Sequence, residues 1–298
     1  MVAITFQHAL QQYQGIFIPS RNFAERTRTE YLSDLTDLLR FLDQLKIQKI
    51  HQVTIVVLVQ YLAELDRRGY AGSTRKRKFS SLRSFFRFLN NNAYLDEDLA
   101  QRLPPPHTEN KEPRVLSEFE YKQLLRACAY ETRDAAIIEL LLQTGIRLSE
   151  LTRLTLDDIE LPLQINHDPT NTGILRIIGG KGRKDRTLPL NYKACKALKA
   201  YLNIRPKVDT RKIFINKFGN PLGPRGVQLL MQKYFQEAGI KGAHVHSLRH
   251  TFGTHHVAKG TSLRTVQEAL GHKDLKTTSI YISLAREVMN KELQDHAL

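Results

Sequence analysis

Apolar side chains recur every three or four positions along most of the chain, the spacing that places them on one face of an α-helix. Before residue 100 this pattern predicts four helices and no strand, at about residues 5–16, 22–45, 54–69 and 73–91. The second helix has the clearest apolar stripe, made of Tyr31, Leu35, Leu38, Leu39 and Leu42. The first third of the chain is therefore expected to form a four-helix domain.

A proline-rich, polar segment follows these helices. Residues 101–114 read QRLPPPHTENKEPR and contain four of the eleven prolines in the chain. Proline lacks a backbone donor and disfavours helix at the preceding residue, so an extended linker is expected here. We predict an N-terminal domain over residues 1–103, a linker over 104–114 and a second domain over 115–298.

The helical pattern resumes after the linker and is interrupted once. Ser117 and Glu120 have the spacing of a capping box and predict a helix that begins near residue 118. Further helices are expected at residues 132–143, 148–153, 192–204, 226–238, 246–258 and 262–270, with a final pair around 281 and over 284–294. Between them, β-branched residues and leucines flank the charged turn KGRK and predict a two-stranded hairpin. The expected fold is mainly α, with a small antiparallel sheet in the second domain.

Composition and charge narrow the class of protein. The 298 residues are 41% hydrophobic, which is ordinary for a globular protein, but 45 Lys and Arg against 30 Asp and Glu give a formal net charge of +15. Such a surplus favours a polyanionic partner such as nucleic acid, although membrane-surface and heparin-binding proteins share it. Cys128 and Cys195 form no C-x-x-C pair, and the N-terminus lacks the pattern of a signal peptide. We therefore expect a cytoplasmic protein without a disulfide framework.

The predicted helix at residues 73–91 concentrates positive charge. Between residues 75 and 87 it contains no acidic residue and six cations: Arg75, Lys76, Arg77, Lys78, Arg83 and Arg87. Aromatic residues and leucines interleave with them at helical spacing and are expected to face the core. A helix fits the major groove of DNA, so we predict that the six cations contact DNA. The alternative is a solvated basic face over an aromatic core.

The second domain contains residue types that suit chemistry on a phosphodiester. They are Arg147, Lys181, His246, Arg249, His272 and Tyr281. Each side chain can donate hydrogen bonds toward the negative charge that develops on an attacked phosphorus, and a tyrosine can be the nucleophile. Glu150 follows Arg147 by three positions and could hold that guanidinium for phosphate binding. Taken singly, each has a structural alternative: a surface Arg147–Glu150 pair, a solvated loop lysine or a half-buried helix tyrosine.

Two of the histidines raise the question of a metal site. His246 and His250 are four residues apart, as in zinc-binding helices. However, Ser247 takes the place of the glutamate of an H-E-x-x-H motif, and no acidic third ligand lies nearby. We predict no metal, and a supporting structural role for His250.

The order and spacing of these residues resemble one family. The matching strings are TGIRLSEL around Arg147, GGKGRKDRTLPL around Lys181, HSLRHTFGTHHVAKGTSLRTVQEALGHKD, and TTSIYI at Tyr281. Over residues 115–281 the chain resembles the tyrosine recombinases of the phage-integrase and Xer type. The loop at residues 161–173 is longer than in compact Xer-like members, which weighs against the branch that resolves chromosome dimers.

The resemblance implies a role for each residue. Tyr281 would attack the scissile phosphate and become linked to the DNA 3′ end. Arg147 and Arg249 would bind the non-bridging oxygens, and His272 would donate a third hydrogen bond.

The remaining two residues would move protons: Lys181 would protonate the departing 5′ oxygen, and His246 would assist proton transfer at the tyrosine. Because a phosphotyrosine bond conserves the energy of the broken linkage, the resemblance implies no metal, ATP or other cofactor.

The resemblance also implies partners. These are double-stranded core sites with inverted repeats, and a homotetramer that exchanges strands between two sites through a Holliday junction, as in mobile-element integration, excision or resolution. The tail could pass to a neighbouring subunit with an apolar side formed by Leu284, Val288, Met289 and Leu293. In the alternative, the tail packs on its own domain. Two other functions stay open: DNA relaxation of the type IB topoisomerase kind, and a non-catalytic DNA-binding accessory protein.

Overall fold

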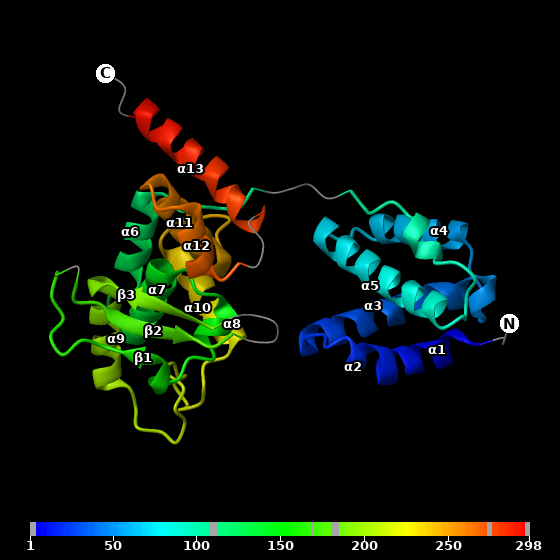
Figure 1. Cartoon of the computed structure of the whole chain (residues 1–298), viewed down its shortest axis with the longest axis horizontal. Helices are drawn as coiled ribbons and strands as arrows, with labels where there is room; N and C mark the ends of the chain where they lie inside the picture. The colour runs from blue at the N-terminus through cyan, green and yellow to red at the C-terminus, as the bar shows by residue number, and fades with distance from the viewer. Residues whose placement is uncertain (1–3, 108–111, 169, 180–184, 273–275, 296–298) are drawn as a thin grey trace. The chain divides into compact units, whose positions relative to one another are not determined.

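The protein folds as two compact units, Met1–Lys111 and Glu112–Leu298 (Figure 1). The computed structural model describes residues 4–107, 112–168, 170–179, 185–272 and 276–295, the last helix partly by its backbone alone. Within these ranges, no helix combines the length and apolar character needed to cross a membrane.

The N-terminal unit is helical throughout its described residues. Its elements are α1 (Phe6–Gln12), the π-helical turn η1 (Tyr13–Phe17), α2 (Ile18–Ser20), α3 (Glu25–Gln44), η2 (Ile50–Gln52), α4 (Ile55–Arg67), α5 (Gly72–Asn91) and η3 (Leu99–Arg102). Thr5 and Thr54 cap α1 and α4, where each hydroxyl accepts a backbone hydrogen bond. The predicted cap at Ser73 is wrong, because α5 begins one residue earlier at Gly72.

The apolar stripes of these helices meet in one core. Leu38 and Leu42 of α3 pack with Leu58 of α4 and with the aromatic side of α5. Aromatic rings extend this core toward η1, where Tyr13 meets Phe85 edge-on at 5.3 Å between ring centroids. The aromatic half of α5 is therefore core, as predicted, and the polar half is left for other contacts.

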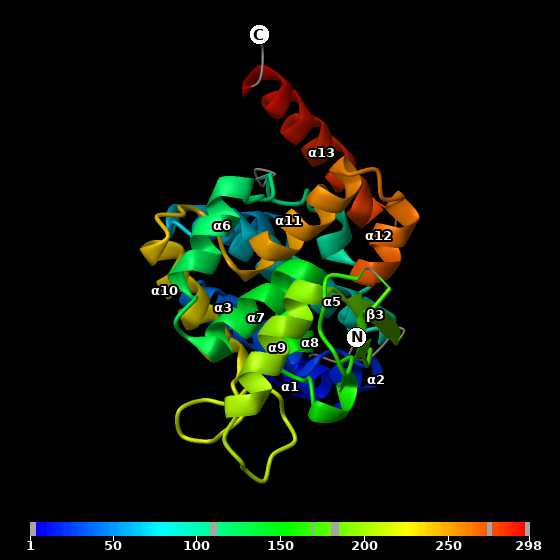
Figure 2. The ribbon, with the colours of Figure 1, turned by 90° about the vertical axis from the view of Figure 1, so that its left-hand side faces the viewer.

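The C-terminal unit is built around α7. Its helical elements are α6 (Glu118–Ala127), α7 (Thr132–Thr144), α8 (Leu148–Leu151), η4 (Leu156–Asp158), α9 (Tyr192–Ile204), α10 (Pro224–Glu237), α11 (Val245–Ala258), α12 (Leu263–Leu270) and α13 (Lys276–Asp295). The capping box of Ser117 and Glu120 is present at the start of α6. The apolar residues of α7 are buried on several sides, because α9 and α11 both pack against it (Figure 2).

A small antiparallel sheet lies beside these helices. It has the order β1 (Ile159–Glu160), β2 (Gly173–Ile177), β3 (Arg186–Leu190), and Leu175 is paired with Leu188. The predicted hairpin is confirmed as β2 and β3, and the sheet has a third strand, β1, that the sequence pattern did not indicate. On β3 the side chains of Leu188 and Leu190 are buried, so the period of two places Arg186 on the same face.

The two cysteines of the chain lie inside this unit. Both thiols are fully buried, Cys128 after α6 and Cys195 on α9. Burial raises the pKa of Cys128 to about 12 and also raises that of Cys195. Neither thiol is therefore reactive near neutral pH, because the thiolate is the nucleophile.

The C-terminal segment forms one continuous helix, so the prediction of a final pair of helices is wrong. In its first half, Tyr281 and Leu284 pack against Phe252, Val266 and Leu270 of α11 and α12. Its second half extends beyond α11 and α12 in both views (Figures 1 and 2). Of the apolar side predicted for the tail, Leu284 is buried in its own unit and Val288 is half-buried, whereas the side chains of Met289 and Leu293 lie outside the description.

Candidate active site

Three arginines converge on the C-terminal end of α12. The last carbonyls of a helix have no partner within it, and the end of the helix carries partial negative charge. Here each of three successive carbonyls accepts a hydrogen bond from a different guanidinium. The pairs are Arg186 Nε to Ala269 O at 2.7 Å, Arg249 Nη2 to Leu270 O at 2.6 Å and Arg147 Nη2 to Gly271 O at 2.9 Å. The helix end thus holds a cluster of positive charge in a defined arrangement.

Gly145 brings two of these arginines together. It ends α7 with a positive φ of 61°, which turns the chain so that Arg147 caps α8. Its carbonyl accepts Nη1 of Arg249 at 2.6 Å. A Cβ at this position would lie 2.5 Å from a ring carbon of Phe252 and 2.8 Å from Leu270, so both the backbone and the packing require glycine.

Glu150 holds the cluster from the other side. Its carboxylate accepts the main-chain NH of Arg147 at 2.9 Å and the Arg147 Nη1 at 2.8 Å, so the predicted pairing is present. Arg186 donates to the same carboxylate through Nη2 at 2.8 Å and Nη1 at 3.2 Å. Burial by itself would raise the pKa of Glu150, but the hydrogen bonds and charges of Arg186 and Arg147 lower it to about 2. The carboxylate is therefore ionised and bonded to two guanidiniums.

Arg186 is the residue that sequence reasoning missed. It lies in the matched string GGKGRKDRTLPL, but it resembles one more charge of the turn. The signal that could have identified it is the alternation along β3, which puts Arg186 in register with two buried leucines. An arginine on the buried face of a strand needs partners, and these are Glu150 and Ala269.

Arg249 is buried and remains charged. Burial, followed by repulsion from Arg147, lowers its pKa to about 9, which is still above neutrality. The two described hydrogen bonds of Arg249 use two of the five N–H donors of a guanidinium. Donors therefore remain for an anion.

His272 follows Gly271 directly, so the helix end also sets its position. Burial and the charges of Arg249 and Arg147 lower its pKa to about 4, and the ring is neutral at pH 7. Its Nδ1 lies 2.9 Å from the hydroxyl of Thr278 on α13. When Nδ1 accepts from that hydroxyl, the ring hydrogen is on Nε2, which is then a donor for a phosphate oxygen.

Tyr281 lies against α11 and is only 1% exposed. A Cβ at Gly253 would be 2.8 Å from its ring, so the ring rests directly on the helix backbone. Burial raises the pKa of Tyr281, although Arg249 and Arg147 oppose the shift. The nearby cations therefore do not ionise the hydroxyl while the ring is buried.

The imidazole beside the Tyr281 hydroxyl is that of His250, with Nδ1 3.4 Å from Oη. Burial, followed by repulsion from His246 and Arg249, lowers the pKa of His250 to about 4, so the ring is neutral and can accept a proton. His246 is instead exposed in the first turn of α11, where it lines an open hollow of about 710 Å³ with residues of α10. Partial desolvation lowers the pKa of His246 as well, and the charges of His244, Arg249 and Arg147 add to this shift. The contact between His250 and the Tyr281 hydroxyl was not predicted from the sequence. The other predicted site residue, Lys181, lies outside the described residues.

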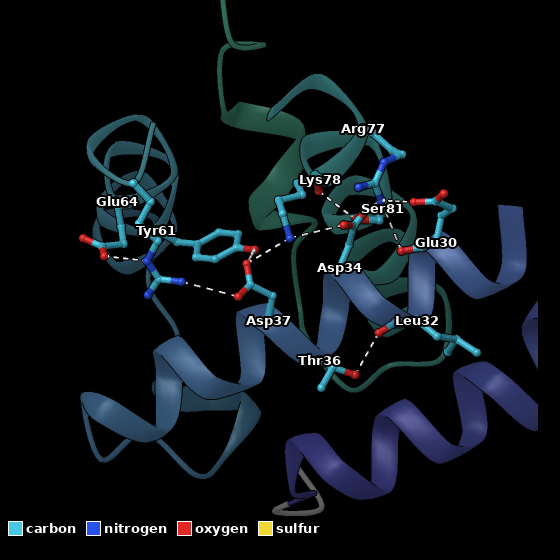
Figure 3. A network of polar contacts seen from close by, with 11 residues as sticks. Glu30, Leu32, Asp34, Thr36, Asp37, Tyr61, Glu64, Arg77, Lys78 and Ser81 are labelled. Atoms are coloured by element: carbon cyan, nitrogen blue, oxygen red, sulfur yellow. Dashed lines mark hydrogen bonds and ion pairs between the residues drawn. The ribbon is translucent and has the colours of Figure 1, made fainter. Parts of the chain in front are cut away.

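Helix α5 differs from the predicted basic face because acids from other helices reach it (Figure 3). Lys78 is buried between Asp34 and Asp37 of α3, with Nζ–O distances of 3.2 and 2.9 Å. Arg77 pairs with Asp34 and, at 3.0 Å, with Glu30. The prediction that Lys78 contacts DNA needs correction, because its side chain is 7% exposed and bonded to two carboxylates.

The other cations of α5 differ in their availability. Arg75 is paired with Asp66 of α4. Lys76 and Arg87 are exposed, and the half-exposed Arg83 lies over the Phe79 ring at 5.8 Å. Lys76, Arg83 and Arg87 are therefore the members of the predicted set best placed to meet a polyanion.

Comparison with known proteins identifies the family of this site. Residues 114–287 match the phage integrase family, and residues 10–92 match the phage integrase N-terminal SAM-like domain. The chain belongs to the phage integrase family of tyrosine recombinases. It is 34% identical over 289 residues to tyrosine recombinase XerC of Listeria innocua, with 93% of each chain covered. It is also 33% identical over 270 residues to XerC of Pseudomonas syringae pv. tomato, covering 89% of this chain and 87% of that one.

Solved tyrosine recombinases share the fold. XerH bound to palindromic difH substrate in a post-cleavage complex has a TM-score of 0.76 at 22% identity, over 96% of this chain and 84% of that one. A lambda integrase dimer bound to a COC′ core site has a TM-score of 0.75 at 18% identity, over 94% and 77% of the chains. The mainly helical two-unit fold predicted from the sequence is thereby confirmed.

Proposed function

We propose that this tyrosine recombinase cleaves and rejoins DNA at specific core sites through a 3′-phosphotyrosyl intermediate at Tyr281. The observation that carries the proposal is the convergence of Arg147, Arg249 and His272 at the end of α12, with Tyr281 packed beside them. Two guanidiniums and a neutral imidazole donor suit a phosphate that gains negative charge when it is attacked.

In the proposed reaction the Tyr281 oxygen attacks the scissile phosphorus, and the bond from phosphorus to the 5′ oxygen breaks. Arg147, Arg249 and His272 bind the non-bridging oxygens. Lys181 gives a proton to the departing 5′ oxygen. A neutral imidazole takes the tyrosine proton, and His250 joins His246 as a candidate because it already contacts the hydroxyl.

Rejoining reverses these steps. A 5′ hydroxyl attacks the phosphotyrosine, the new phosphodiester forms and the tyrosine regains its proton. One phosphodiester is broken and one is made, so the cycle needs neither ATP nor a metal ion.

The proposed partner is double-stranded DNA with inverted-repeat core sites, which the two units would enclose through the linker. A homotetramer would exchange strands between two such sites through a Holliday junction, and a lambda integrase tetramer bound to a Holliday junction shares the fold at a TM-score of 0.75. The outcome would be integration or excision of a mobile element, or resolution.

The second half of α13 would dock on a neighbouring subunit. Support comes from the helix itself, because Tyr281 and Leu284 in its first half are buried in their own unit and its second half projects beyond α11 and α12. Val288, Met289 and Leu293 are the residues we assign to this contact, with Leu284 retained in its own unit.

The decisive experiment uses a suicide substrate, a core site nicked so that a cleaved strand cannot rejoin. The wild-type chain should form a covalent adduct, whereas Tyr281→Phe should bind the same DNA and form none. Tyr130→Phe is the matched control, since Tyr130 is 96% exposed and should keep full activity. If Tyr281→Phe still forms an adduct, Tyr281 is not the nucleophile. Relaxation of supercoiled plasmid that lacks any core site would instead indicate a topoisomerase of type IB.

A further inference from the structure

We infer that Arg186 is a positioning residue of the active site, which aligns the Arg147 guanidinium and the end of α12 by bonding Glu150 and Ala269 at the same time. The inference rests on the proposed function, since it concerns the donors that would bind the scissile phosphate.

The contacts of Arg186 join three elements of the C-terminal unit. From the first position of β3, its guanidinium reaches Glu150 on α8 with two hydrogen bonds and the Ala269 carbonyl of α12 with a third. Its side chain is 11% exposed. Each of its three nitrogens donates to Glu150 or Ala269, so we assign Arg186 to positioning these groups rather than to binding the phosphate.

The partners of Arg186 are the groups that set the phosphate donors. Glu150 Oε1 accepts from both Arg186 and Arg147, so the two guanidiniums share one carboxylate. Ala269 lies three residues before His272, at the helix end that also binds Arg147 and Arg249. A Cβ at Gly271 would lie 3.0 Å from Arg186 Nη1, so the guanidinium also packs against the turn that leads into His272.

Loss of Arg186 would disturb both sets of contacts. Glu150 would be left with one guanidinium for a full negative charge and would hold Arg147 more tightly and in another orientation. The Ala269 carbonyl would lose its donor, and the turn at Gly271 its support. A lysine could replace the charge but not the planar fork that serves a carboxylate and a carbonyl together.

The test measures DNA binding and adduct formation separately on full-length protein. Arg186→Lys and Arg186→Gln should bind the core site within about twofold of wild type. At saturating DNA, their single-turnover adduct rate should fall by about 10- to 100-fold, the range for a small misplacement of reacting groups. Arg186→Gln and Glu150→Gln should be non-additive, since they act on one carboxylate. Arg205→Gln is the control, because Arg205 also binds main-chain carbonyls but does so after α9, and its rate should match wild type.

A second substrate separates positioning from general loss of structure. A methylphosphonate at the scissile position lacks one charged oxygen and so depends less on an aligned Arg147. The rate on phosphate divided by the rate on methylphosphonate is independent of how much of a variant is folded. This ratio should fall by about 10-fold for the Arg186 variants, as it should for Arg147→Gln.

Two results would overturn the inference: a wild-type rate for either Arg186 variant, or a rate ratio that equals the wild-type ratio. If wild-type protein itself forms no adduct, it is the proposed function that fails.

Discussion

Gly145 combines a left-handed backbone, a close approach and a hydrogen-bond acceptor within one residue. Its φ of 61° orients Arg147, its carbonyl binds Arg249, and its missing side chain leaves room for Phe252. The phosphate-binding donors therefore depend on a residue that has no functional group of its own. A position can therefore be sensitive to substitution although its side chain takes no part in the chemistry.

Gly145→Ala should destabilise the C-terminal unit by about 2–5 kcal/mol, because the positive φ and the contact at 2.5 Å both become unfavourable. Urea unfolding and the adduct rate check this. Gly260→Ala is the control, since Gly260 has a φ of +83° with nothing within 4 Å and should lose only about 1–2 kcal/mol. Equal losses at the two positions would contradict the packing argument.

Acid should destabilise the active site over a defined range of pH. His250 and His272 have folded pKa values of about 4, below the ordinary 6.5, so the unfolded chain binds more protons between these values. The contribution of these two histidines to the free energy of unfolding is complete above pH 6.5 and is lost as the pH falls toward 4. Glu150 has the same effect at lower pH: its stabilising contribution is present above pH 4.5 and is lost as the pH falls toward about 2.

Hydrogen exchange of amides in residues 245–272 measures this dependence. Protection should be constant above pH 7, after correction for intrinsic exchange, and should fall below pH 6.5. His272→Gln should flatten part of that fall, whereas His51→Gln, an exposed site in the other unit, should not change it. Protection that rises as the pH is lowered would show that the sign is wrong.

At the scale of elements, α5 combines core, ion-pair and surface functions along one helix. Its phenylalanines fill the core, Lys78 is bonded to two aspartates of α3, and Lys76 is exposed two residues away. The two lysines are thus alike in sequence and opposite in environment, so they should respond differently to the same substitution.

Lys78→Met should lower the free energy of unfolding of the N-terminal unit by about 3–5 kcal/mol, because it leaves buried carboxylates with one cation fewer. Lys76→Met should change that free energy by less than about 0.5 kcal/mol and should reduce the salt dependence of DNA binding by about one phosphate contact. Thermal unfolding and binding at several salt concentrations separate the two effects. A reversed pattern would mean that Lys78 reaches DNA.

Local signals predicted most elements, and long-range pairing escaped prediction. The capping box at Ser117 and the alternation of β3 are read within a few residues, and both are present. The acids that pair with α5 lie up to about 47 residues earlier in the chain, so the helix looked uncompensated. Strand β1 has two residues, too few for an alternating pattern, and exists because it pairs with β2.

In the candidate site, too, local features could be predicted from the sequence and long-range contacts could not. The residue types and their order were readable, and Arg147, Arg249, His272 and Tyr281 do gather near one helix end. The carbonyls that hold the arginines carry no sequence signal, because every residue has one. Burial of the tyrosine and its contact with His250 depend on how α13 packs on α11, which no local pattern reports.

At the scale of the whole molecule, the proposed assembly depends on the second half of α13. Deletion of residues 287–298 removes this half of the helix and keeps Tyr281 and Leu284, which are buried in their own unit. The truncated chain should bind a single half-site with unchanged affinity but lose cooperative occupancy of two adjacent half-sites. Gel-shift titration on one- and two-half-site duplexes measures this, and retained cooperativity would place the subunit contact elsewhere.

The buried thiols make the chain a ready subject for distance measurements. Because Cys128 and Cys195 are fully covered and have raised pKa values, a maleimide dye should leave both unlabelled in the folded protein. One cysteine introduced on the surface of each unit would then carry the only dyes, with no need to remove the native residues. Energy transfer between the two labels would then follow the distance between the units in real time as DNA is added, in a protein whose core is unaltered.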